Sequence, residues 1–117
     1  MEAIDTDVKL DYSDVLIEPK TSTLESRSEV TVDRSFKLKY AGLNWSGVPI
    51  IAANMDTTGT MEMAHSLNDF GAATALHKHY DVSELINFFS SNEWSGESTF
   101  YSLGTSRADF DKLADFI

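Results

Sequence analysis

The stretch VPIIAANMD, residues 48–56, begins as an apolar run and ends on an amide, a thioether and a carboxylate. The stretches AATALHK (72–78) and TFYSLGT (99–105) have the same form, because each is largely apolar and then turns polar. After each of them, apolar residues recur every three or four positions, which is the spacing of one helix face. A strand, a polar turn and a helix repeated in this way predict an α/β fold with parallel strands and crossover helices.

Three helices are expected, and the first runs from about Gly59 to Phe70. Their apolar stripes consist of Met63, Leu67 and Phe70, then Val82, Leu85, Ile86 and Phe89, and last Phe110, Leu113, Ala114 and Ile117. The later two helices begin with sequences typical of capping boxes, Asp81 with Glu84 and Ser106 with Asp109. Each stripe is expected to pack on another part of the fold.

The chain is predicted to divide into an N-terminal arm, residues 1–47, and three strand–helix units, residues 48–117. The arm is polar, and its segment EVTVDRSFKL (29–38) indicates brief strands or extended chain around Val30, Val32 and Phe36. No low-complexity tract interrupts it, so a packed extension is expected rather than a linker. The last helical stripe reaches Ile117 without a C-terminal glycine or a basic last turn, which is typical of a fold that continues further.

Composition excludes several classes of function. The chain has 117 residues, with 9 Lys and Arg against 19 Asp and Glu, and a net charge of -10 disfavours nucleic acid as a partner. It has no Cys, which excludes disulfides, thiolate metal sites and a cysteine nucleophile in this chain. The sequence has no apolar run long enough for a membrane span and begins with an acidic segment unlike a signal peptide, so a cytoplasmic protein without a membrane partner is expected.

The polar strand ends are the candidate site, because ligands of parallel α/β proteins bind at the carboxyl ends of strands. For Asp56 a helix cap and a ligand contact are both open readings. His77 and His79 alternate as metal ligands do, but no third ligand is evident, so metal binding is disfavoured. The residues alone favour a solvated rim position for Lys78 slightly over a phosphate contact.

Three long blocks carry a resemblance to a known family: DVLIEPKTSTLESRSEV (14–30), GVPIIAANMDTTGTMEMA (47–64) and TALHKHY (74–80). In this order they resemble the N-terminal third of the GMP reductases. The related IMP dehydrogenases typically carry serine and proline before Met-Asp, so Ala53 and Asn54 favour the reductases, and so does the sequence HKHY (77–80). The chain also runs directly from 81–89 into a third unit, without the regulatory insertion of most dehydrogenases. Thr58 departs from the valine expected of the reductases.

The resemblance implies an incomplete TIM (β/α)₈ barrel, of which this chain supplies the arm and the first three βα units, since a whole barrel takes about 250 residues. It also implies NADPH-dependent conversion of GMP to IMP and ammonia in purine nucleotide salvage. The nucleophilic cysteine and the potassium site of that reaction lie in later parts of the barrel. This chain is therefore expected to hold no catalytic residue, to be inactive alone, and to belong to a homotetramer.

The site residues that the resemblance implies are supporting ones. Ser26 and Arg27 match arm positions that reach the NADPH of a neighbouring subunit, and an Arg guanidinium suits a 2′-phosphate. Lys78 matches a cofactor-contacting lysine, which reverses the rim reading. Asn54 and Met55 match the strand end that lies against the purine nucleotide. Asp56 is expected to have a structural role, which is to hold the turn at the strand end.

Two alternatives remain open from the sequence. One is a non-catalytic docking subunit, which pairs with a complementary barrel partner through its unpaired strand and its arm. The other is a fragment of an IMP dehydrogenase.

Overall fold

The computed structural model describes residues 7–117, which divide into two compact units, one up to Val30 and the other Thr31–Ile117. In the first unit, two short helical turns, η1 (Tyr12–Asp14) and η2 (Arg27–Glu29), each begin with a capping box. Every described residue of this unit is exposed, and Leu16 and Ile17 are each 97% exposed. The expected packing of the arm is therefore absent in residues 7–30, because no element here is longer than one turn and none buries an apolar side chain.

The second unit begins with an antiparallel hairpin of β1 (Arg34–Lys37) and β2 (Asn44–Gly47). Phe36 lies opposite Trp45, and their rings stack with centroids 6.2 Å apart. The strand expected near Phe36 is confirmed, whereas Val30 and Val32 lie outside it. This hairpin belongs to the same compact unit as the later strands, and the predicted domain boundary after residue 47 stays a prediction.

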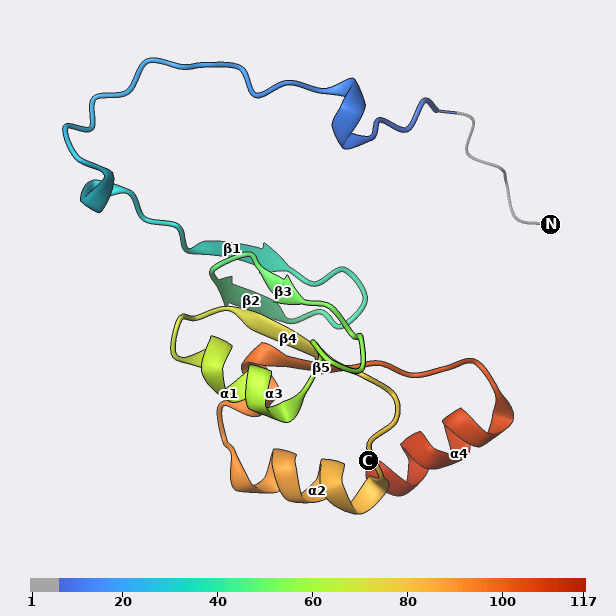
Figure 1. Cartoon of the computed structure of the whole chain (residues 1–117). Coiled ribbons are helices and arrows are strands. Elements are labelled where there is room, and N and C mark those ends of the chain that lie inside the picture. The colour runs from blue at the N-terminus through green and yellow to red at the C-terminus, as the bar shows by residue number, and fades with distance from the viewer. Residues whose placement is uncertain (1–6) are drawn as a thin grey trace. The chain divides into compact units, whose positions relative to one another are not determined.

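The parallel strands are confirmed. A three-stranded sheet has the order β3 (Ile51–Ala52), β4 (Ala73–Leu76), β5 (Thr99–Tyr101), with each strand beside the next in the sequence (Figure 1). Ala52 pairs with Thr74, and Thr74 pairs with Thr99. The carboxyl ends of all three strands therefore lie at one edge of the sheet.

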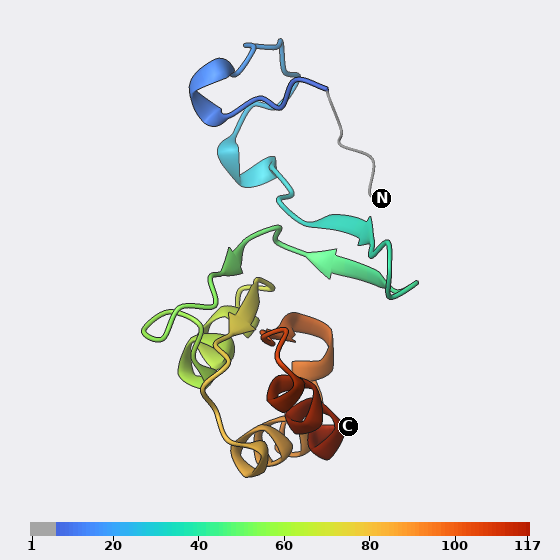
Figure 2. The same cartoon turned by 90° about the vertical axis from the view of Figure 1, so that its right-hand side faces the viewer.

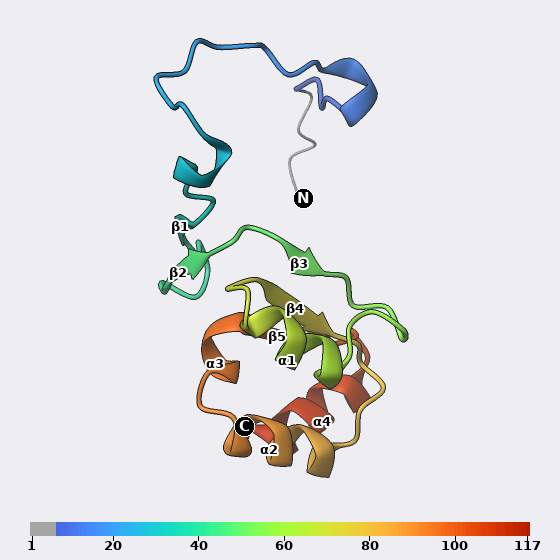
Figure 3. The ribbon, with the colours of Figure 1, turned by 60° about the vertical axis from the view of Figure 1, so that its left-hand side comes forward.

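Residues 7–117 contain four α-helices: α1 (Met61–Asn68), α2 (Val82–Ser91), α3 (Ser95–Ser98), which leads into β5, and α4 (Arg107–Phe116). They lie on one side of the three-stranded sheet, and the hairpin lies on the other (Figure 3). The short α3 was not expected from the sequence. None of the helices in residues 7–117 is long and apolar enough to cross a membrane.

Both predicted capping boxes are present. The Asp81 N–H donates to Glu84 at 2.8 Å, and the Ser106 N–H donates to Asp109 at 3.1 Å. The first helix is shorter than predicted at both ends. It begins after Thr60, because the Thr60 hydroxyl accepts the Met63 N–H at 3.1 Å and so caps the helix.

The core combines Ala64, Leu76, Leu85 and Phe88, and partly buried side chains pack against it: Met61, Tyr80, Phe89, Trp94, Tyr101 and Phe116. Helices α2 and α4 contact each other (Figure 2), with the Phe89 and Phe116 rings 5.4 Å apart. The core therefore lies on the helical side of the sheet.

The predicted helix stripes are only partly right. In α2 the buried residues are Leu85 and Phe88, while Ile86 is 46% exposed. Phe70 and Ile117 are largely exposed as well. The reason is geometric. The place of the core decides which side of each helix faces inward, and the spacing of apolar residues alone does not predict that side.

Candidate functional site

The loop after β3 is closed by its own backbone. The carbonyl of Met55 accepts N–H groups from Thr58 at 2.9 Å and from Gly59 at 2.7 Å. These bonds fix the backbone of Met55. Its side chain is 62% exposed, and the neighbouring Asn54 is exposed too. Both residues predicted to contact substrate therefore lie at the surface of the strand end.

Gly59 ties this loop to the next strand end. It is buried, its carbonyl accepts the His77 N–H at 3.0 Å, and a Cβ at this position would lie 2.2 Å from the Ala75 carbonyl oxygen. Only glycine allows so close an approach of two backbones. The loops after β3 and β4 are thereby held next to each other.

Asp56 adds a second link between the two loops. Its carboxylate lies 3.4 Å from Nε2 of His79, a distance that makes an ion pair when the histidine is protonated. The reading of Asp56 as a helix cap is wrong, because Thr60 caps α1 instead. Both side chains of the Asp56–His79 pair are mostly exposed, so it contributes little to stability.

The turn after β4 presents Lys78. Within residues 7–117 the Lys78 ammonium makes no hydrogen bond and no ion pair, and the side chain is exposed. On one flank of the turn, the His77 ring stacks on Tyr80 with centroids 4.2 Å apart, and the Tyr80 hydroxyl accepts the Met61 N–H at 3.0 Å. The turn is therefore anchored, while the Lys78 side chain is exposed and makes none of these contacts. The described residues contain no cluster of three or more His, Cys, Asp or Glu that could hold a metal ion.

The third strand-end loop, Gly104–Ser106, contacts the carboxylate of Asp109 in α4. The Ser106 hydroxyl and its backbone N–H donate to Asp109 at 2.5 Å and 3.1 Å, and these bonds hold the pKa of Asp109 below its ordinary value. The positive charge of Lys78 acts in the same direction, more weakly. Gly104 leaves room for this carboxylate, because a Cβ there would lie 2.3 Å from Oδ2 of Asp109.

Two predicted cofactor contacts, Ser26 and Arg27, belong to the first unit. The Ser26 hydroxyl accepts the Ser28 N–H at 3.3 Å, and its own N–H donates to Glu29 at 2.8 Å. Ser26 therefore caps η2. The Arg27 guanidinium is exposed and makes no hydrogen bond or ion pair with another described residue. The cofactor role of both stays a prediction.

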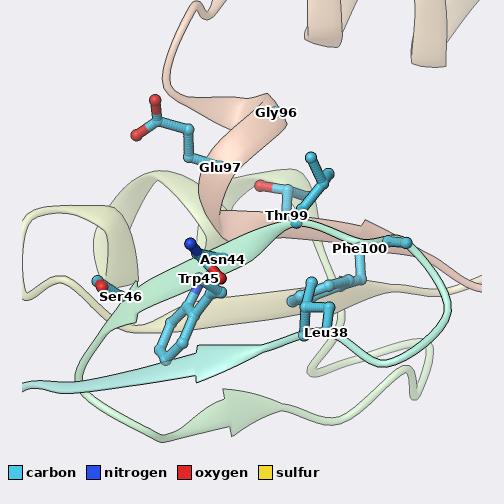
Figure 4. Close-up of a pocket in the computed structure, with 10 residues that line it drawn as sticks. Leu38, Asn44, Trp45, Ser46, Gly96, Glu97, Thr99 and Phe100 are labelled. Atoms are coloured by element: carbon cyan, nitrogen blue, oxygen red, sulfur yellow. The ribbon is translucent and has the colours of Figure 1, made fainter.

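A cavity of about 540 Å³ lies away from these loops, between the hairpin, α3 and β5 (Figure 4). Leu38, Trp45 and Phe100 form its apolar part, and Glu97 lies at its other side. It lies at the amino end of β5, and none of the polar strand-end residues lines it. Because ligands of parallel sheets bind at the carboxyl ends, this cavity is a packing groove between hairpin and sheet.

Sequence reasoning missed two residues near the candidate site, Tyr101 and Lys112. Both side chains donate to the backbone carbonyl of Lys78. Their positions in the sequence carry no local signal for this role, since they lie 23 and 34 residues away from Lys78.

Comparison with known proteins agrees with this arrangement. Residues 9–90 match the family described as IMP dehydrogenase / GMP reductase domain. The chain is 52% identical to a GMP reductase of Salmonella paratyphi C and 53% identical to one of Klebsiella pneumoniae, in each case over 97% of this chain and 33% of the relative. It thus spans about a third of the length of the curated relatives it matches.

A solved structure shows the same fold. The inosine 5′-monophosphate dehydrogenase of Legionella pneumophila superposes with a TM-score of 0.62 at 27% identity, over 89% of this chain and 30% of that one. The chain belongs to the IMP dehydrogenase / GMP reductase family.

Proposed function

We propose that this chain supplies the first strand ends of a cytoplasmic GMP reductase, which converts GMP to IMP and ammonia with NADPH in purine nucleotide salvage. One observation carries the proposal: the close backbone approach at Gly59 places two strand-end loops side by side. One loop bears the predicted substrate contacts and the other bears Lys78. The identity of about 52% to GMP reductases supports the same assignment.

The described residues fit the binding of an anionic dinucleotide and a purine. The Lys78 ammonium is exposed and unpaired within residues 7–117, as a contact to a phosphate or carboxamide requires. The Arg27 guanidinium suits a 2′-phosphate by its fixed charge and its planar fork. The Asn54 amide can both donate to and accept from a purine edge, and Met55 offers a polarisable apolar surface to the ring.

NADPH, when bound, supplies the hydride that replaces the departing amine at C2 of the purine. The chain contains no Cys, so the nucleophile that the mechanism needs lies outside these 117 residues. The potassium site is proposed to lie outside them as well. In this proposal residues 1–117 bind and orient, as the start of a (β/α)₈ barrel in a homotetramer.

The test is a chimera in which these 117 residues replace the matching third of the Salmonella paratyphi C GMP reductase. The chimera is expected to oxidise NADPH only when GMP is present, and to release ammonia and IMP in equal amounts. The 117-residue chain alone is expected to show no turnover. A folded chimera that binds neither GMP nor NADPH would contradict the proposal.

A second chimera, in which these 117 residues replace the matching part of the Legionella pneumophila inosine 5′-monophosphate dehydrogenase, separates the two branches of the family. Oxidation of IMP with NAD by this second chimera, with no turnover by the first, would favour the dehydrogenase. The relatives at 51–53% identity are reductases, whereas the dehydrogenase structure is 27% identical, so the reductase reaction is expected.

A docking subunit is the second candidate, and exposed apolar side chains favour it. On the sheet face opposite the helices, Ile51 is 57% exposed and Phe100 is 36% exposed. A complementary barrel partner would cover them. Co-purification with such a partner in a fixed ratio would support this candidate, and a monodisperse monomer would count against it.

A further inference from the structure

Lys112 of α4 reaches across the fold to the turn after β4. Its ammonium donates to the Lys78 carbonyl at 3.0 Å and to the Tyr80 carbonyl. The Tyr101 hydroxyl donates to the same Lys78 carbonyl at 3.2 Å, and the Lys112 ammonium lies 5.6 Å from the centre of the Tyr101 ring. One cation and one phenol thus converge on the backbone of a single turn.

The physical effect of these contacts is to order the turn. A lysine ammonium has three donors, and here two of them satisfy backbone carbonyls beyond the end of the strand. Hydrogen bonds from a charged donor are about twice as strong as neutral ones. Lys112 is partly buried, and its ammonium is bound to backbone carbonyls. Lys78 is exposed, so its ammonium is available to a ligand.

Contacts on the opposite flank complete the anchoring. The His77 N–H donates to Gly59, and the Tyr80 hydroxyl accepts the Met61 N–H, both at 3.0 Å. The turn is therefore fixed from α1 on one side and from α4 on the other. The Lys78 side chain itself makes no hydrogen bond within residues 7–117, and its charge acts only at longer range, on the Asp109 carboxylate.

We propose that Lys112, together with Tyr101, is a positioning residue that orders residues 77–80 so that the Lys78 ammonium is presented to an anionic group of the bound cofactor. The identity of that group as part of NADPH rests on the proposed function. Without Lys112, the turn would have to be ordered at the moment of binding, and this entropy cost would weaken cofactor binding. The chemical step would not change, because Lys112 touches no reacting atom.

The experiment compares Lys112→Met with Lys112→Arg, which keeps a charged donor. Arg107→Met is the matched control, because Arg107 lies on the same helix and, within residues 7–117, pairs with Asp111 alone. Tyr101→Phe removes a single hydroxyl and serves as the milder variant should Lys112→Met fail to fold. Amide hydrogen exchange of residues 77–81 is measured on the 117-residue chain without nucleotide, and KM and kcat for NADPH are measured in the chimera.

Lys112→Met is expected to speed exchange in residues 77–81 and to raise KM for NADPH by about threefold to tenfold, the net size of one ordinary hydrogen bond, with kcat unchanged. Tyr101→Phe is expected to give the same pattern more weakly, while Lys112→Arg and Arg107→Met stay near the parent. If amide exchange of residues 77–81 is unchanged in Lys112→Met, the inference is overturned whatever the kinetics. If Lys112→Met does not fold, unchanged exchange in Tyr101→Phe has the same meaning.

Faster exchange with an unchanged KM also overturns it, because the turn would then be ordered without serving the cofactor. A parent chimera that fails to reduce GMP contradicts the proposed function instead, and the exchange comparison still tests the role of Lys112. The two failures are therefore distinguishable.

Discussion

Replacing Gly59 by Ala tests whether the two strand-end loops are held together by close backbone approach. The added Cβ would lie 2.2 Å from the Ala75 carbonyl oxygen and 2.8 Å from that of Ala53, where real Cβ contacts essentially never fall below 3.0 Å. Neither oxygen belongs to a flexible side chain. Relief of the clash therefore requires movement of the backbone by about 0.8 Å at Ala75.

The magnitude follows from two effects. Overpacking of a rigid site costs about 1–3 kcal/mol. Displacement of Gly59 also lengthens the hydrogen bond between its carbonyl and the His77 N–H, which adds about 1 kcal/mol. Together they predict that Gly59→Ala lowers the free energy of unfolding by about 2–4 kcal/mol.

Urea unfolding of the 117-residue chain, followed by the fluorescence of Trp45 and Trp94, measures this change. Gly96→Ala is the matched control, because a Cβ there meets nothing within 4 Å and Gly96 lies inside α3. It is expected to be neutral or slightly stabilising. A Gly59→Ala midpoint within the error of the parent would refute the close-approach argument.

Three further changes follow from the same structure. Thr74→Val is expected to stabilise the fold by about 1 kcal/mol in urea unfolding, because the buried Thr74 hydroxyl has no hydrogen-bond partner among the described residues. Asp109→Asn is expected to remove an acid-sensitive part of α4 stability. Since Ser106 lowers the folded-state pKa of Asp109, this stability is present above the unfolded pKa and is lost as pH falls through the lowered value, below about pH 4. Lys78→Met in the chimera is expected to raise KM for NADPH by about tenfold with kcat retained.

Each of these has an outcome that would count against it. A destabilised Thr74→Val would mean that the hydroxyl has a partner, such as a bound water. If the Asp109→Asn variant and the parent unfold at the same acid pH, the ionised Asp109 carboxylate does not stabilise the start of α4. A Lys78→Met chimera with unchanged KM would place Lys78 at a solvated rim.

The local features of the fold were predictable because they depend on neighbouring residues. Both capping boxes, Asp81 with Glu84 and Ser106 with Asp109, span three positions, so their pattern is complete in the sequence. The parallel strands followed from apolar runs that alternate with helical spacing. The family followed from long ordered blocks of sequence rather than from a short motif.

Tertiary structure decided what depends on distant neighbours. Thr60 rather than Asp56 caps α1, because the loop after β3 leaves Asp56 free to meet His79, which is 23 positions later in the sequence. Phe88 rather than Ile86 enters the core, because the helices pack on one face of the sheet. Lys112 holds the turn of Lys78 across 34 positions. Local sequence patterns were therefore enough to predict the three parallel strands, the helices that alternate with them and the family, because these depend on near neighbours. The contacts of α1 and α4 with the turn after β4 join residues far apart in the chain, so only the folded structure shows which side chains meet at the strand ends.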